Sequence, residues 1–155
     1  MDRELKRARE LAYRYLALRD RSVSELRDYF RRKEVPADVV ETVLGEFIRY
    51  GYLDDRRFAA SFAKSLIERK GLSRYALKME LKRKGVPEGD IEQALEGLFG
   101  ENGYDEDEVA RSLARKKAKS LGNLPQDKAR RRLADYLRRR GFSFEAVRKA
   151  MTGII

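Results

Sequence analysis

The chain repeats itself three times, and this repetition limits its possible folds more than any other feature. The apolar positions of one helical pattern recur every 51 residues, at Ala8, Ala59 and Ala110. A second pattern recurs after 51 and then after 56 residues, at Leu26, Leu77 and Leu133. Repeats of this length are typical of proteins that stack small structural units in tandem.

The spacing of apolar residues is helical almost everywhere, and no stretch alternates as a strand does. We expect helices at 3–20, 23–34, 37–50, 55–70, 73–84, 88–99, 105–120, 127–140 and 144–152. The predicted fold is therefore all-α, with three tandem three-helix repeats in an elongated, curved array: residues 1–51, 52–103 and 104–155. The five additional residues of the third repeat are expected in the loop at 121–126.

Residues typical of helix caps fall where the predicted helices begin and end. Gly85 and Gly141 suit the left-handed conformation just beyond a helix C-terminus. Asp54 and Asp105 suit N-caps, because a carboxylate accepts hydrogen bonds from the free N–H groups of a first turn. This capping role explains the dense carboxylates at the starts of the repeats better than an acid–base pair does.

The positive charge is concentrated in the third repeat. The chain has 36 Lys and Arg against 26 Asp and Glu, a net charge of +10. Residues 104–155 hold 14 of the basic and 7 of the acidic residues. An excess of this size indicates a polyanionic partner, with nucleic acid first among the candidates.

Basic residues gather at the end of each repeat's second helix. We call these runs the basic triplets: Arg31-Arg32-Lys33, Lys82-Arg83-Lys84 and Arg138-Arg139-Arg140. Cations are also favoured at helix C-termini by the helix dipole, which suffices to explain any one triplet. Three triplets at equivalent positions predict a continuous surface for phosphates or an acidic groove, to which we add Arg115, Lys116 and Arg131.

Two tyrosines precede the triplets at equivalent positions, Tyr29 and Tyr136. Such rings suit stacking on nucleic-acid bases, although a tyrosine more often flanks the core with one buried side. Both interpretations stay open from the sequence.

Catalytic chemistry finds little support in the composition. The chain has no His and no Cys, which removes the commonest general base, the commonest metal ligands and any disulfide. We expect no enzyme, cofactor or metal site. Without cysteines, a secretory leader or a long apolar run, we also expect a cytoplasmic monomer that does not enter membranes.

One segment has a recognisable pattern. Gly51-Tyr52-Leu53-Asp54-Asp55-Arg56-Arg57-Phe58-Ala59 resembles the signature that joins the first two repeats of the RecX family, bacterial regulators of the RecA recombinase. Arg21–Leu26, Glu80–Val86 and Tyr136–Phe142 resemble further parts of that family's repeats. The resemblance runs from about Arg9 to Met151. Glu34 departs from it, since the family usually has glycine there.

The resemblance implies a protein that binds RecA filaments within the helical groove, close to single- or double-stranded DNA. It implies a mainly inhibitory regulator of filament assembly, ATP hydrolysis, strand exchange and co-protease activity, hence of homologous recombination, DNA repair and the SOS response. Tyr52 and Phe58 are expected to hold the repeats in register, within an inter-repeat linker that comprises Gly51, Tyr52, Leu53, Asp54, Asp55 and Phe58.

An alternative function follows from the helical pattern alone. Small three-helix units often place one helix in a nucleic-acid groove, so a stand-alone DNA- or RNA-binding protein with homeodomain-like repeats fits the same sequence. That alternative predicts tight, strongly salt-dependent binding without RecA.

Overall fold

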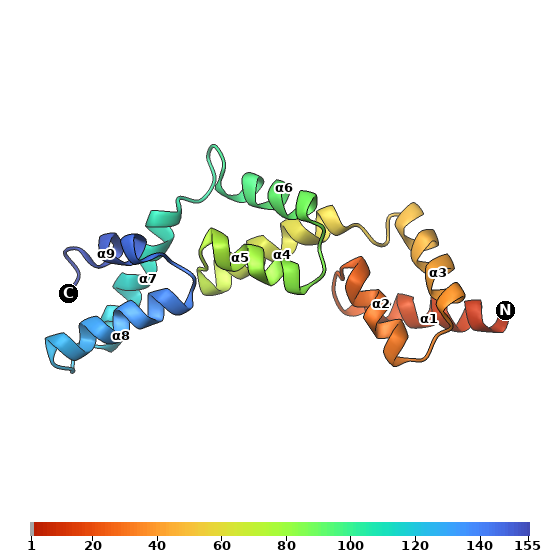
Figure 1. Ribbon diagram of the computed structural model, residues 1–155, viewed down its shortest axis with the longest axis horizontal. Helices are drawn as coiled ribbons and strands as arrows, with labels where there is room; N and C mark the ends of the chain where they lie inside the picture. The colour runs from red at the N-terminus through yellow and green to blue at the C-terminus, as the bar shows by residue number, and fades with distance from the viewer. Residues whose placement is uncertain (1) are drawn as a thin grey trace.

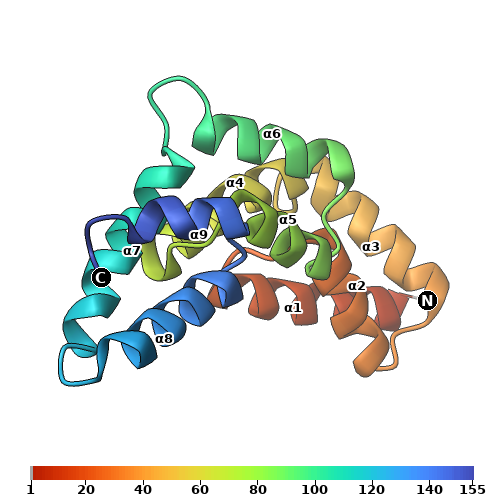
Figure 2. The ribbon, with the colours of Figure 1, turned by 60° about the vertical axis from the view of Figure 1, so that its left-hand side comes forward.

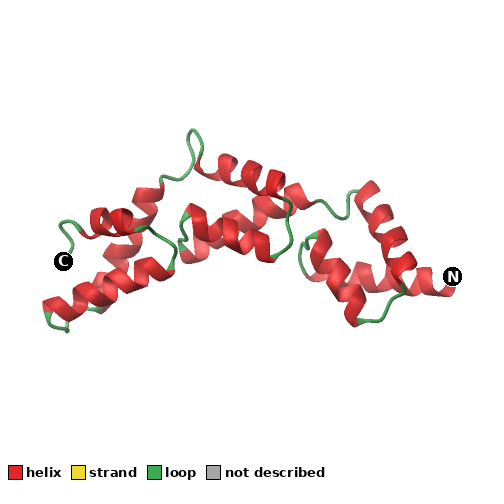
Figure 3. Cartoon of the chain, in the orientation of Figure 1, coloured by secondary structure: helices red, strands yellow, loops and turns green. Residues whose placement is uncertain are grey.

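The computed structural model describes residues 2–155, which form nine α-helices and no β-strand (Figure 3). Their bounds are α1 (Asp2–Leu18), α2 (Val23–Arg32), α3 (Ala37–Arg49), α4 (Asp55–Lys70), α5 (Arg74–Arg83), α6 (Glu88–Phe99), α7 (Glu106–Ser120), α8 (Gln126–Arg139) and α9 (Phe144–Met151). The predicted all-α fold is confirmed, and each helix begins and ends within two residues of its expected position.

The helices form three bundles that follow one another along an arch, with the chain termini at its two ends (Figure 1). Every helix pair with extensive contact belongs to one bundle, so α1–α3, α4–α6 and α7–α9 each pack among themselves. We refer to these bundles as repeats 1, 2 and 3. The loop between α6 and α7 stands away from the arch in both views (Figure 2).

Each repeat has its own hydrophobic core. Phe30 and Phe47 are fully buried in repeat 1, Leu77 and Ile91 in repeat 2, and Phe142 in repeat 3. Burial of such a side chain stabilises the fold by about 1.5–3 kcal/mol. Three small separate cores explain why the contacts between repeats are confined to short segments.

Side-chain caps fix where several helices begin. Asp54 accepts hydrogen bonds from the backbone N–H groups of Arg56 and Arg57, and Asp105 accepts one from Asp107, so both are the predicted N-caps. Three serines cap other helices in the same way: Ser22, Ser73 and Ser143. Ser22 and Ser73 are also completely buried, which a solvent-exposed helix start would not require.

The additional residues of repeat 3 were wrongly expected in a loop. Helix α8 has 14 residues, whereas α2 and α5 have 10 each, so most of the insertion extends α8 by one turn at its N-terminus. Pro125 occupies the N-cap position, where a fixed φ favours helix initiation. The extension lengthens the most basic helix of the molecule.

Candidate basic binding surface

The basic triplets lie at the C-terminal ends of α2, α5 and α8. Their last residues, Lys33, Lys84 and Arg140, are the C-caps of these helices. The two preceding residues of each triplet are exposed in the last helical turn. The triplets therefore occupy equivalent places in the three repeats, as the sequence predicts.

The end of α5 meets the start of α2 at what we call the first joint. The Ser22 hydroxyl donates a hydrogen bond of 2.5 Å to the Lys84 carbonyl, and the Val23 N–H donates one of 2.9 Å to Asp55 Oδ1. Lys84 Nζ also lies 3.3 Å from Glu25 Oε2. Asp55 and Lys84 thus belong to repeat 2 but bind the start of a repeat 1 helix.

The end of α8 meets the start of α5 in the same way at the second joint. The Ser73 N–H donates a hydrogen bond of 3.1 Å to the Arg140 carbonyl, and the Arg74 N–H donates one of 3.1 Å to Glu106 Oε1. The Arg140 guanidinium also donates to the carbonyl of Lys70. No ion pair crosses this joint among residues 2–155, unlike the first joint.

The two joints place α8, α5 and α2 end to end along the arch (Figure 1). The C-caps of α5 and α8 each direct a carbonyl toward the start of the next helix, where it accepts from the Ser22 hydroxyl at the first joint and from the Ser73 N–H at the second, an arrangement that the helix dipole favours. Two predicted binding residues, Lys84 and Arg140, are therefore engaged between repeats. The other triplet residues retain solvent-facing side chains.

Glycine is required at both joints. Gly85 has φ +75°, and a Cβ built there would lie 2.2 Å from the Cβ of Ser24. Gly141 has φ +93°, and its Cβ would lie 2.4 Å from Ser73 Oγ. Glu34 occupies the matching position at the end of α2 with φ +58°. Among residues 2–155 no other repeat packs against this end of α2, and Arg7 instead donates to the Lys33 carbonyl.

Several predicted binding residues carry internal partners. Arg31 Nη1 lies 3.0 Å from Asp28 Oδ1, and Arg115 Nη1 lies 3.4 Å from Glu108 Oε1. Arg83 pairs with Glu80. Exposed pairs of this kind contribute at most about 1 kcal/mol, so they exchange readily for an external anion.

The remaining predicted cations have no acidic partner within 4.0 Å in the part of the chain that the structure describes: Arg32, Lys33, Lys82, Lys116, Arg131, Arg138, Arg139 and Arg140. Four of these eight belong to α8 or its C-cap. Arg138 donates a hydrogen bond of 2.7 Å to the Phe142 carbonyl, and its guanidinium carbon lies 3.9 Å from the centre of the Phe144 ring.

Helix α8 exposes more cations than the predicted set contains. Lys128, Arg130 and Arg132 are also exposed and have no ion pair among residues 2–155. Arg130 donates instead to the Ile155 carbonyl, at 2.6 Å. The run of arginines at 130–132 is the sequence signal for these residues. Its pattern alone did not show that they lack acidic neighbours.

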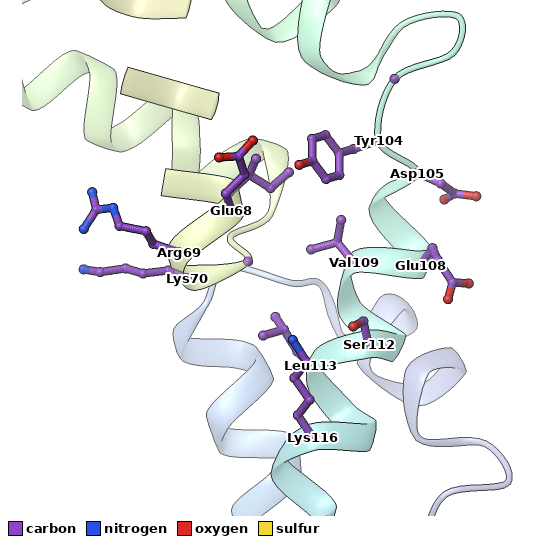
Figure 4. A pocket seen from close by; sticks show the side chains of 13 residues that line it. Glu68, Arg69, Lys70, Tyr104, Asp105, Glu108, Val109, Ser112, Leu113 and Lys116 are labelled. Atoms are coloured by element: carbon purple, nitrogen blue, oxygen red, sulfur yellow. The ribbon is translucent and has the colours of Figure 1, made fainter. Parts of the chain in front are cut away.

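A groove separates repeats 2 and 3 beside the second joint (Figure 4). Its volume is about 590 Å³, and its lining includes Ile67, Val109 and Leu113. The Tyr104 and Val109 side chains extend across the gap toward the end of α4, whereas the Arg69 and Lys70 side chains extend away from it (Figure 4). Lys116 also lines this groove, apart from the triplets.

The linker between repeats 1 and 2 is shared between two cores. Leu53 is buried in the core of repeat 1, and Phe58 is buried in that of repeat 2, where it stacks on Phe62. Gly51 has φ +79°, which permits the turn after α3. Tyr52 contacts the Phe47 ring with its own ring about half exposed. These positions support a structural role for the linker.

Two carboxylates of the first joint titrate abnormally. Burial pushes the pKa of Glu25 upward, but hydrogen bonds from Arg19 and from the Ser22 N–H, with the charge of Lys84, outweigh it and leave this pKa below its ordinary value. Burial raises the pKa of Asp55, against the hydrogen bond from Val23, and nearby Asp90 adds to the rise. The first joint therefore favours the charged form of Glu25 and disfavours the charged form of Asp55.

The two tyrosines that precede the triplets are already engaged. The Tyr29 ring stacks on Tyr15, with 4.0 Å between ring centres and 2° between planes. The Arg140 guanidinium carbon lies 4.7 Å from the centre of the Tyr136 ring, and Lys117 Nζ lies 5.1 Å from it. Internal packing therefore occupies at least one face of Tyr29.

Two other kinds of site are not found in the part of the chain that the structure describes. No group of three or more acidic side chains there is arranged to hold a metal ion. Between residues 2 and 155, no helix has the length and apolar character needed to cross a membrane.

Comparison with known proteins assigns the repeats one by one. Family models described as RecX, first, second and third three-helix domain match residues 8–47, 54–95 and 105–151, in that order. A solved structure of RecX from Lactobacillus salivarius has the same fold, with a TM-score of 0.80, 18% identity and coverage of 99% of this chain and 98% of that one.

Relatives with higher sequence identity bear a single name. The chain is 41% identical to "Regulatory protein RecX" of Amycolatopsis mediterranei, over 88% of this chain and 77% of that protein. It is 36% identical to the protein of the same name from Thermobifida fusca, over 88% and 72% of the two chains. The chain therefore belongs to the RecX family of regulatory proteins.

Proposed function

We propose that this chain regulates RecA recombinase filaments, mainly as an inhibitor, by laying its basic helices in the filament groove beside DNA. Family membership supports the choice of RecA, since the relatives are named as RecX regulatory proteins. The single structural observation that supports it most is the row of α8, α5 and α2, which ends in unpaired arginines on α8.

The proposed mechanism uses binding without covalent chemistry. An arched row of cations contacts several phosphates or acidic side chains of a helical polymer at once, so its effective affinity exceeds that of any one contact. A protein bound across neighbouring RecA subunits would favour filament states that fit its arch. Assembly, ATP hydrolysis, strand exchange and co-protease activity would all change with that population. The proposal includes a monomer acting in the cytoplasm.

The direct test is ATP hydrolysis by RecA on single-stranded DNA. Purified protein added at amounts stoichiometric with the filament should lower the steady-state rate. A protein that leaves the rate unchanged under these conditions would contradict the proposed function. Electron microscopy of the same samples should show shorter filaments if assembly is the step affected.

A second candidate is a stand-alone nucleic-acid-binding protein. The exposed and unpaired arginines along α8 favour it, because they suit phosphate contacts without any protein partner. Oligonucleotide binding measured without RecA distinguishes the two functions. Tight binding at physiological salt that RecA does not strengthen supports the second candidate, whereas weak binding strengthened by RecA supports the first.

A further inference from the structure

An exposed cluster of aromatic rings lies at the end of repeat 1, away from the basic triplets in sequence. We call Tyr13, Tyr50 and Tyr52 the tyrosine platform. Their exposed fractions are 50%, 69% and 48%. The ring centres of Tyr13 and Tyr52 are 5.7 Å apart, and those of Tyr50 and Tyr52 are 6.4 Å apart.

The tyrosine platform is held in place by packing on a core residue and by hydrogen bonds to its turn. The buried Phe47 ring lies 4.9 Å from Tyr13 and 5.4 Å from Tyr52, measured between ring centres. Arg57 donates hydrogen bonds to the carbonyls of Gly51 and Tyr52, at 3.0 and 3.3 Å. The turn that carries the exposed rings is therefore fixed, and little side-chain or loop entropy would be lost when a ligand binds.

Charge around the platform suits an anion. The Arg49 guanidinium carbon lies 5.9 Å from the centre of the Tyr50 ring, and Arg49 has no acidic partner among residues 2–155. The carboxylates nearby are already occupied. Glu46 receives two hydrogen bonds from Arg9, at 2.7 and 2.9 Å, and Asp20 pairs with Arg57 at 3.4 Å.

We propose that the tyrosine platform binds unstacked bases of single-stranded nucleic acid, with Arg49 beside it for a phosphate. Exposed aromatic faces combined with arginine are the features on which successive bases stack. A double helix cannot use the platform, since its bases already stack on one another. The inference deepens the nucleic-acid part of the proposed function, on which it rests, and adds contact with bases to contact with phosphates.

Oligonucleotides with and without bases test this directly. Fluorescence anisotropy, without RecA, measures affinity for a labelled 20-residue oligothymidylate and for an abasic strand of equal length and charge. The native protein should bind the thymidylate at least about fivefold more tightly. The Tyr50→Ala/Tyr52→Ala variant should bind the two strands almost equally, with an unchanged dependence on salt.

Two matched variants separate stacking from general effects. Tyr50→Phe keeps an aromatic face and should retain the preference for bases. Tyr75→Ala removes a tyrosine that is 64% exposed on α5, outside the platform, and should change neither affinity. If the double variant melts early by circular dichroism, Tyr50→Ala alone is decisive, because Tyr50 is the most exposed ring of the three.

Equal affinity of the native protein for both strands would overturn the inference, as would a preference that survives loss of the tyrosines. Variants that keep the preference but lose their effect on RecA would assign the platform to a protein partner and also overturn it. Failure of the proposed function is distinguishable, since a native protein without effect on RecA can still prefer bases over abasic strands.

Discussion

Repeats 2 and 3 have the same fold but differ in whether the basic residues of their second helices pair with acidic ones. In repeat 2, α6 carries Glu88, Glu92 and Glu96, which we call the acidic stripe. Lys78 lies 3.2 Å from Glu88, and Arg74 lies 2.8 Å from Glu96. In repeat 3 the residues at the matching positions of α9 and beyond are Phe144, Arg148 and Thr152.

This difference leaves the two second helices with different surfaces. Lys82 is the one lysine or arginine of α5 without an acidic partner in the described chain. No lysine or arginine of α8 pairs with an aspartate or glutamate there, although Arg130 donates to the Ile155 main-chain oxygen. An unpaired cation binds an external phosphate without first giving up an internal partner. The comparison teaches that equivalent basic runs are not equivalent binding sites, and that α8 should dominate.

Charge reversal on α8 is predicted to have the largest effect. Arg131→Glu/Arg139→Glu should weaken binding to RecA filaments on single-stranded DNA by more than about tenfold at moderate salt, because it removes two free cations and adds repulsion. Lys82→Glu/Arg83→Glu in α5 makes the same change in net charge and should weaken binding less than about threefold. Equal losses in the two variants would remove the distinction between the repeats.

The joints are predicted to be the next most sensitive feature. Gly141→Ala and Gly85→Ala should each lower the free energy of unfolding by about 1–3 kcal/mol, because φ is positive and the new Cβ overlaps the neighbouring repeat. Glu34→Gly at the end of α2, where φ is also positive, should stabilise the fold slightly or leave it unchanged. Urea unfolding followed by circular dichroism measures all three variants, and a destabilised Glu34→Gly variant would contradict the prediction.

Introducing acidic residues on α9, or removing them from α6, tests the comparison between repeats 2 and 3. Phe144→Glu/Arg148→Glu gives α9 the acidic residues of α6, so α8 should lose part of its positive potential. Filament binding should weaken a few-fold, and its dependence on salt should become shallower. Glu92→Gln/Glu96→Gln in α6 should have the opposite effect, as it frees Arg74 and leaves Lys78 paired with Glu88 alone. Surface plasmon resonance at several salt concentrations measures both.

The smallest expected effect concerns pH at the first joint. The pKa of Glu25 is lowered in the fold, so its contribution to stability is present above the unfolded pKa and is lost as pH falls through the folded value. The raised pKa of Asp55 has the opposite sign and costs stability as pH rises. Asp55→Asn should therefore raise the melting temperature slightly at pH 7 but not at pH 3. Its amide oxygen still accepts the Val23 N–H. A lower melting temperature at pH 7 would contradict this.

Much of the fold follows from local sequence signals. Apolar spacing determines which helix faces are buried, while Asp54, Asp105, Gly85 and Gly141 mark helix ends, and all of these act within a few residues. The bounds of α8 were predicted within one residue, but the five additional residues of repeat 3 were assigned to the loop before it, because the loop and the extra helical turn have similar composition. What distinguishes them is that Ala129 and Leu133 of α8 are buried in the core of repeat 3.

The positions of the basic triplets were predictable from the sequence, but their pairing with acidic residues was not. The triplets are consecutive basic residues in the sequence, and the spacing of the repeats predicted that they occupy equivalent positions. The engagement of Lys84 and Arg140 at the joints depends on residues from another repeat, as does the need for glycine beside them. The neutralisation of α5 depends on carboxylates that approach from α6. The sequence of a basic triplet does not show such long-range pairings.

The most direct test of the account is a side-by-side titration of RecA ATP hydrolysis on single-stranded DNA with three proteins: the native chain, the α8-reversed variant and the α5-reversed variant. We predict inhibition by the native and α5-reversed proteins at similar concentrations, and little inhibition by the α8-reversed protein, although all three melt at similar temperatures. Undiminished inhibition by the α8-reversed protein, or none by the native chain, would contradict it.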